Sequence, residues 1–229
     1  MYYEPGRTPH NLPHDPFKSC VVPRPIGWIS TVDSTGQHNL APFSQFQNVN
    51  FDPPIVLFCA NQKTTGTRKD SVANAEATGE FVWNMATYAL REAVNLTAQE
   101  LPPEIDEFEL AKLTKLPSTL VRPVRVAESP IHFECRYLQT VRLPGKGAIG
   151  TADVVFGQVI AIHIADHALR EDGCIDILKL RPIARLGYYD YTSIESVFSM
   201  RIPGGEAMNA GLEGSAEKYQ AAIVSRTKG

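Results

Sequence analysis

A short apolar run at residues 55–60, IVLFCA, is the feature that most restricts how this chain folds. It follows Asp52-Pro53-Pro54, and its length suits a strand buried on both faces better than a helix. A turn rich in Thr and Gly comes next at residues 61–67, and Arg68-Lys69 then opens the segment SVANAEATG, which ends at Gly79. The order of strand, cationic turn and helix predicts that a core sheet ends beside an anion site.

The chemistry of an anion site is present at residues 67–71. A first helical turn carries free backbone N–H groups, a Thr or Ser cap and the positive end of the helix dipole, and here two cations precede it. Cations are unfavourable there unless an anion compensates for them, so a bound phosphate would explain them. The alternative is a solvated surface pair. We expect a phosphate beside Thr67, Arg68, Lys69, Asp70 and Ser71.

A hairpin precedes this region, with a strand at residues 27–32 and a turn at 33–36. We predict its returning strand over residues 41–49, where polar and apolar side chains occur on both faces. A bound ring system with polar edges and apolar faces would account for this pattern. The alternative is that Ser44 and Asn48 complete hydrogen bonds at a bulge.

Two long runs resemble the flavin reductase-like, FMN-binding split-barrel family: PRPIGWISTVDSTGQHNLAPFSQFQNVNFDPPIVLFCA and TRKDSVANAEATGEFVWNM. This family includes flavoredoxins and the reductase components of two-component flavin monooxygenases. The similarity continues in DEFELAKLT, SPIHFECRYLQTVRLPG, FGQVIAIHI and RPIARLGYYDY, and covers about residues 20–203. The resemblance implies a mainly β fold, a Greek-key split barrel of about six strands with flanking α-helices.

The resemblance also implies that FMN is the cofactor and that two neighbouring strands line it. An isoalloxazine ring needs hydrogen-bond partners for N1, O2, O4 and N5. We expect the ring and the ribityl chain to be held by Ser44, Gln45, Phe46, Asn48, Cys59 and Ala60. NAD(P)H would be a transient hydride donor, and no catalytic acid, base or nucleophile is required of the protein. No GxGxxG motif follows a strand, so no separate nicotinamide domain is predicted.

Two functions remain open at this point. One is an NAD(P)H:FMN oxidoreductase that supplies reduced flavin to a partner oxygenase or reduces an acceptor directly. The other is a non-enzymatic electron carrier or FMN-binding protein of the flavoredoxin type. A haem-binding split barrel is a third alternative, but no His stands in an axial-ligand setting. The resemblance further implies a homodimer, in which an excursion at residues 102–118 covers a flavin site, often the partner subunit's; Lys112 departs from the family pattern there.

Composition narrows the classes of partner. The formal net charge is −3 with no basic stripe, which argues against nucleic acid. No apolar run of about 18 residues and no signal-peptide pattern occurs, so we expect a cytoplasmic protein without a membrane span. No metal site is expected, because prolines interrupt the His10/His14 spacing. The four cysteines lack a CxxC pair and should be reduced, with Cys59 and Cys135 buried in strands.

The predicted organisation is an N-terminal arm at residues 1–19, one domain at residues 20–203 and a C-terminal tail at residues 204–229. We predict a helix over residues 88–99 that buries Leu90, Val94 and Leu96. Further strands are predicted at residues 80–85, 131–143, 154–166 and 183–191. His163 near a strand end has two interpretations, a contact to nicotinamide or a structural role.

Overall fold

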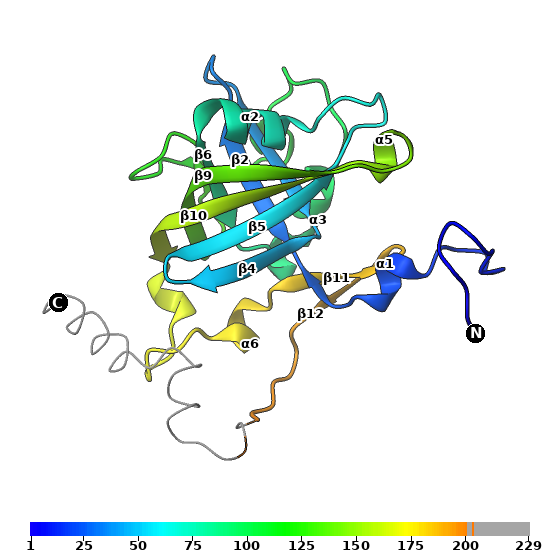
Figure 1. Ribbon diagram of the computed structural model, residues 1–229. Coiled ribbons are helices and arrows are strands. Elements are labelled where there is room, and N and C mark those ends of the chain that lie inside the picture. Colours follow the sequence, from blue (N-terminus) through cyan, green and yellow to red (C-terminus); the bar gives the residue numbers. More distant parts are fainter. Residues whose placement is uncertain (201–202, 204–229) are drawn as a thin grey trace, which may run out of the picture. The chain divides into compact units, whose positions relative to one another are not determined.

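A computed structural model describes residues 1–200 and 203 of the chain (Figure 1). Its contacts divide the chain into two units, Met1–Glu195 and Ser196–Gly229. The fold and the candidate site belong to the first unit. The tail predicted at residues 204–229 lies outside the described residues, and the arm at residues 1–19 stays a prediction.

The first unit is built on an antiparallel sheet of seven strands. Their spatial order is β3 (His38–Phe43), β2 (Gly27–Val32), β6 (Glu80–Asn84), β9 (Ile131–Leu143), β10 (Ala152–Ile164), β5 (Pro54–Asn61) and β4 (Phe46–Phe51). Figure 1 shows β9, β10, β5 and β4 side by side. The mainly β, split-barrel prediction is confirmed, with seven strands in place of about six.

The two edges of this sheet meet through a short connection. β3 and β4 lie at opposite edges, and only Ser44 and Gln45 separate them in the chain. The backbone N–H of Cys59 in β5 donates to the carbonyl of Gln45 at 2.8 Å. The prediction of one strand over residues 41–49 is therefore wrong. The mixed pattern arises because the chain leaves its pairing with β2 and joins β5.

Aromatic rings fill the interior of the sheet. Phe58 and Phe81 are fully buried and pack edge to face, and Phe46 stacks on Trp83 with ring centroids 5.4 Å apart. Large rings supply much of the apolar area that stabilises such a core. Cys135 is buried, as the sequence predicted, and Trp83 is buried as well.

β5 is a strand as predicted, but its burial alternates along the strand. Val56, Phe58 and Ala60 are buried, whereas Leu57 and Cys59 on the other face are partly exposed. The expectations of burial on both faces and of a buried Cys59 are wrong, because a continuous apolar run does not reveal that one face of its sheet lines a pocket.

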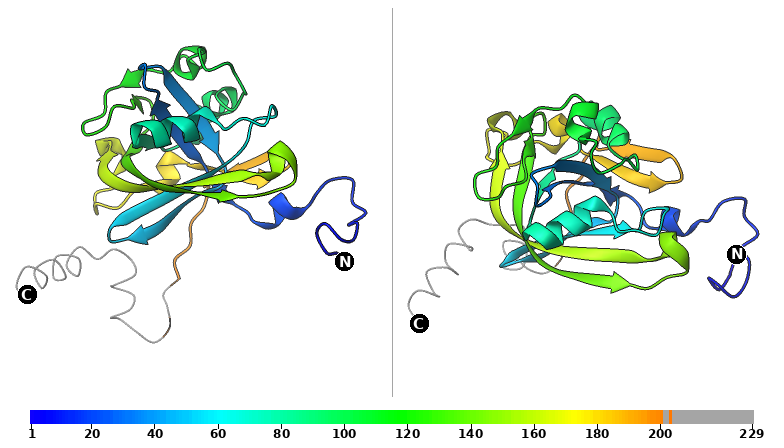
Figure 2. Two further views of the ribbon diagram at one scale, coloured as in Figure 1. Left: turned by 45° about the horizontal axis from the view of Figure 1, so that its top comes forward. Right: turned by 90° about the horizontal axis from the view of Figure 1, so that it is seen from above.

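α2 (Asp70–Thr78) packs against β2 and is the main helix at the site (Figure 2). Its N-cap is Lys69, which makes no side-chain cap hydrogen bond, so the predicted Thr or Ser cap is wrong. It ends, as predicted, at Gly79, whose φ of +77° is a left-handed conformation that glycine adopts at little cost.

The helix predicted over residues 88–99 is a 3₁₀ turn, η1 (Tyr88–Leu90), followed by α3 (Arg91–Leu96). Val94 is buried as predicted, but Leu96 is exposed. The remaining helical segments are short: α1 (Phe17–Cys20), α4 (Glu107–Leu110), α5 (Gly147–Gly150), η2 (Asp166–Ala168) and α6 (Ile177–Leu180).

A second sheet has three strands in the order β1 (Arg24–Pro25), β11 (Ile183–Gly187) and β12 (Asp190–Ser193). The single final strand predicted over residues 183–191 is wrong. Gly187 and Tyr188 both adopt positive φ, and the chain reverses there into a hairpin. A two-stranded pair joins β7 (Lys115–Leu116) to β8 (Arg125–Val126). Among the described residues, none of the helices has the length and apolar character needed to cross a membrane.

The excursion predicted at residues 102–118 packs on its own subunit. Phe108 of α4 is fully buried, and the carboxylate of Glu107 accepts the backbone N–H of Leu40 in β3 at 3.0 Å. Lys112 adopts a φ of +54° just after α4. Coverage of a partner's flavin site by this segment stays a prediction.

Candidate functional site

Two adjoining pockets lie where β3, β5 and the start of α2 meet. The larger has a volume of about 350 Å³ and is lined by Pro42, Phe43, Ser44, Gln45, Cys59, Asn61, Gln62, Thr64, Lys69 and Glu100. The smaller shares Pro42, Phe43, Lys69 and Glu100 with it and adds Asn39, Ala41, Lys63, Asp70, Ser71, Ala98, Gln99, Leu101 and Glu107. Because they share these walls, we treat the two pockets as one cleft.

The cleft brings together six of the eleven residues predicted for a cofactor. Ser44, Gln45 and Cys59 line its larger part, Asp70 and Ser71 line its smaller part, and Lys69 lines both. These residues come from the β3–β4 connection, from β5 and from the start of α2. The grouping follows from the closure of the sheet at Gln45, which sets the connection beside Cys59.

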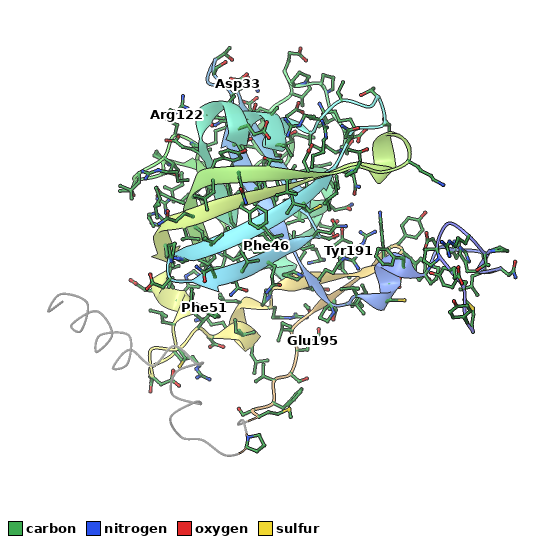
Figure 3. The ribbon with its side chains drawn as sticks, viewed as in Figure 1. Asp33, Phe46, Phe51, Arg122, Tyr191 and Glu195 are labelled. Carbon is green, nitrogen blue, oxygen red and sulfur yellow. The ribbon has the colours of Figure 1, made fainter. Side chains whose placement is uncertain are left out.

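The other five predicted residues do not line either pocket. The Phe46 ring stacks on Trp83 in the core. Phe46 begins β4 and Phe51 ends it, and both residues are labelled in Figure 3. Asn48 is exposed on an edge strand, and Ala60 is buried. Thr67 hydrogen-bonds to Thr65, and Arg68 binds carboxylates. Their assignment to the cofactor stays a prediction.

Sequence reasoning missed several residues of the cleft. Gln62, Lys63 and Thr64 lie in the turn that was recognised as Thr- and Gly-rich, so the turn itself was the available signal. Glu100 lies far along the chain, after α3, and no local pattern connects it to the turn. Only the packing of the elements shows that it belongs to the site.

Each cation at the start of α2 is paired with a carboxylate of the chain. Lys63 Nζ lies 2.8 Å from Asp70, and Lys69 Nζ lies 2.6 Å from Glu100. The guanidinium of Arg68 donates two hydrogen bonds, of 2.5 and 2.6 Å, to the carboxylate of Glu76. The cations are therefore neither a simple solvated pair nor dependent on a bound phosphate for compensation.

Arg68 fastens α2 to the sheet. Besides Glu76, its guanidinium donates to Asp153 of β10 at 3.1 Å, and Asp153 is almost fully buried. The hydrogen bonds to Glu76 and Asp153 raise the pKa of Arg68, against the opposing effect of burial. Arg142 also approaches Asp153, at 3.4 Å. A buried carboxylate between two arginines is costly to leave without a partner.

Cys59 lines the larger pocket. Burial, and next the charge of Asp153, raise the pKa of this thiol above its usual value. A thiol with a raised pKa stays protonated near neutral pH and is a poor nucleophile. Cys59 is therefore suited to contact a ligand as an uncharged group and unsuited to covalent catalysis.

His163 has a structural partner. Its Nε2 lies 2.5 Å from Oε1 of Glu134, which is fully buried and also accepts the backbone N–H groups of Thr119 and Leu120. His163 lines neither part of the cleft. These contacts favour the structural interpretation of His163. Within the part of the chain that the structure describes, no group of three or more His, Cys, Asp and Glu side chains is placed to hold a metal ion.

The profile of one protein family, flavin reductase like domain, matches residues 19–192. The chain belongs to this family. The resemblance drawn from the motifs is thus confirmed, and the flavin reductase-like match spans the whole cleft.

Several proteins are similar to this flavin reductase-like chain. Nitrilotriacetate monooxygenase component B from Bacillus cereus is 31% identical, with a TM-score of 0.79 over 87% of this chain and 98% of that one. An uncharacterized protein of Aquifex aeolicus is 40% identical over 171 residues, 74% of this chain and 84% of the relative. A flavoredoxin of Desulfovibrio vulgaris (Miyazaki F) is 17% identical, with a TM-score of 0.69 over 90% of this chain and 100% of that one, and shows a shared fold.

The lining of the cleft fits a flavin. Ligand pockets in proteins combine apolar walls with a few polar groups and have volumes of about 300–1,000 Å³. Here Pro42 and Phe43 supply apolar surface, Ser44 and Gln45 supply polar groups, and Lys69 supplies a cation at one side. Together with the family, this arrangement supports a flavin oxidoreductase role.

Proposed function

We propose that this protein is an NAD(P)H-dependent FMN reductase that binds FMN in the cleft formed by β3, β5 and the start of α2. The observation that carries the proposal is the meeting of Ser44, Gln45, Cys59 and Lys69 at one cleft, in a chain of the flavin reductase-like family. Its lining matches the needs of a flavin nucleotide, which has an apolar ring with polar edges and a phosphate.

In this proposal the ring and ribityl chain lie along Ser44, Gln45 and Cys59, with backbone groups of Phe46, Asn48 and Ala60 nearby. The phosphate lies toward the backbone N–H groups of residues 67–71 and toward the Lys69 ammonium. The N–H groups and the dipole of a helix start favour an anion, and the first residues of α2, Asp70 and Ser71, line the cleft. Asn39 donates to Ser71 at 2.8 Å and so ties the first turn of α2 to β3.

The residues of the cleft bind and orient, while a bound flavin supplies the redox chemistry by accepting a hydride from the nicotinamide of NAD(P)H. The protein's task is to keep one face of the ring open for that nicotinamide and to supply hydrogen-bond donors to its polar edge. Ser44 and Gln45 are side chains of the larger pocket that can serve as such donors.

One of the similar proteins supports a proposal for the physiological setting. A similar protein is named as component B of a monooxygenase, so we propose that reduced flavin passes to a partner oxygenase. We further propose that the protein acts as a homodimer in the cytoplasm.

The test is anaerobic mixing of the FMN-loaded protein with NADH and, separately, with NADPH. We expect the flavin absorbance near its blue maximum to fall rapidly with at least one donor, far faster than for free FMN under the same conditions. A flavin that stays oxidised with both donors would overturn the reductase proposal and favour the electron-carrier alternative. Protein that does not bind added FMN in a titration would end both.

A further inference from the structure

Glu100 occupies the part of the cleft that the proposed function assigns to a phosphate. Its Oε1 lies 2.6 Å from Nζ of Lys69, and its Oε2 accepts the hydroxyl of Thr64 at 2.9 Å and the backbone N–H of Thr64 at 3.2 Å. An ammonium, a hydroxyl and a backbone N–H are the kinds of donor that hold a phosphate oxygen. Glu100 is thus bound as an anionic ligand would be.

The charge on Glu100 is permanent under ordinary conditions. The hydrogen bond from Lys69, followed by those from Thr64, lowers the pKa of this carboxyl to about 2, although burial opposes the shift. Glu100 therefore remains an anion beside Lys69 at every pH at which the protein would work.

Glu100 reaches this position from an anchored segment. Thr97, just before it, is fully buried, and its hydroxyl accepts the indole N–H of Trp28 at 3.0 Å. The hydrogen bonds of Glu100 then tie the segment at residues 97–101 to the turn at residues 61–69. The Glu100 side chain is one-third exposed, so it has room to leave these donors without moving the anchor.

We propose that Glu100 competes with the flavin phosphate for Lys69 and Thr64 and thereby limits how tightly the cleft holds a phosphate-bearing flavin. This inference rests on the proposed function. A phosphate that approaches Lys69 must displace the carboxylate, because two anions cannot share these donors without repulsion. Glu100 is then a specificity-determining residue: it weakens FMN, which carries a phosphate, and leaves riboflavin, which lacks one, unaffected. Weak retention suits a flavin that is released to a partner.

The test compares FMN with riboflavin on the full-length, flavin-free protein by isothermal titration calorimetry. In Glu100→Gln we expect FMN to bind about 5-fold or more tightly than in the wild type, the factor that corresponds to the upper range for an exposed ion pair, and riboflavin affinity to stay unchanged. Glu171→Gln is the matched control, since Glu171 is exposed in the turn between η2 and α6 and lines neither pocket. It removes the same charge and should change neither affinity by as much as 2-fold.

The outcomes separate the inference from the proposed function. Unchanged or weaker FMN binding in Glu100→Gln, with the wild type still binding FMN, would overturn the competition. Equal tightening in Glu171→Gln would also overturn it, because net charge alone would then be the cause. A wild type that binds neither flavin would instead defeat the proposed function. Glu100→Ala removes the same charge and serves as the second variant if Glu100→Gln is not folded.

Discussion

Arg68 and Lys69 are neighbours in sequence that touch different parts of the molecule. Arg68 joins α2 to β10 through Glu76 and Asp153, and it lines neither pocket. Lys69 lines both pockets and meets only the partly exposed Glu100 among the ion pairs of the described residues. Two adjacent cations at a helix start therefore divide into one that stabilises the fold and one that faces a ligand.

Single substitutions separate these roles. Arg68→Met should lower the free energy of unfolding by about 1–3 kcal/mol, because the nearly buried Asp153 loses one of its two arginines. Lys69→Met should cost less than about 1 kcal/mol in unfolding, since its ion pair is partly exposed. Because Lys69 is proposed to hold the phosphate, we expect a preference for FMN over riboflavin in the wild type; in flavin titrations Lys69→Met should lose this preference, and Arg68→Met should keep it. Urea denaturation and calorimetry measure both quantities. A loss of the preference in Arg68→Met would assign the phosphate to Arg68 instead.

The sequence predicted which residues line the cleft better than it predicted their ion-pair partners. Lys69 and Ser71 were predicted because a cationic turn after a strand has a recognisable composition, and Ser44 because polar and apolar side chains mix along residues 41–49. Glu100 pairs with Lys69, and Asp153 pairs with Arg68. These carboxylates were not predicted, because they come from elements distant in the sequence. Ion pairs between distant elements are set by tertiary packing, and a single sequence does not show which charges will meet.

β10 reaches its place in the sheet through a glycine. A Cβ added to Gly157 would lie 2.3 Å from two atoms of the Phe81 ring and 3.3 Å from Cβ of Cys135. The pairing of β10 with β9 also shifts register between Phe156 and Gly157. Glycine in a strand often marks such a bulge or a close approach. Here it admits the Phe81 ring into the core.

Gly157→Ala should destabilise the protein by about 1–3 kcal/mol, the usual cost of overpacking a filled core. Gly150→Ala is the control, because its Cβ would meet Gly145 at ordinary contact distances of 3.4 and 3.6 Å. Denaturant melts of the two variants measure the difference. Adding Phe81→Leu to Gly157→Ala should recover part of the loss, by vacating the space that the new methyl needs. Equal stability of Gly157→Ala and wild type would contradict this account of the bulge.

Strands with a simple burial pattern were predictable from the sequence, whereas the points at which the chain changes from one partner strand to another were not. The strands near residues 27–32, 55–60 and 80–85 were located by their apolar patterns. Residues 41–49 and 183–191 each form two strands, because the chain turns where no strong turn motif stands. Phe43 and Phe46 look alike in the sequence pattern. However, Phe43 ends β3 and Phe46 begins β4, and these two strands lie at opposite edges of one sheet.

Within the unit Met1–Glu195, part of the long hairpin of β9 and β10 carries exposed apolar side chains. β9 and β10 extend together as one curved arm (Figure 2). Val141 and Leu143 of β9 are 41% and 49% exposed, and Phe51 at the end of the edge strand β4 is 77% exposed. Val141 and Leu143 lie two positions apart on one strand, and neighbouring exposed apolar side chains of this kind are typical of an interaction surface. They are consistent with the homodimer that we propose.

The homodimer makes a prediction about mass. Multi-angle light scattering should give about 50 kDa, twice the 25.2 kDa of one chain. Val141→Asp with Leu143→Asp should give a folded monomer, since burying two carboxylates in an apolar interface is unfavourable. Leu120→Asp is the control, because Leu120 is 58% exposed on a different loop and should leave the mass at that of a dimer.

Wild-type protein with a mass near 25 kDa would end the homodimer proposal. A dimer that persists in the double variant would move the interface away from β9. Phe51→Asp would then test β4, an edge strand beside which a second copy can pair.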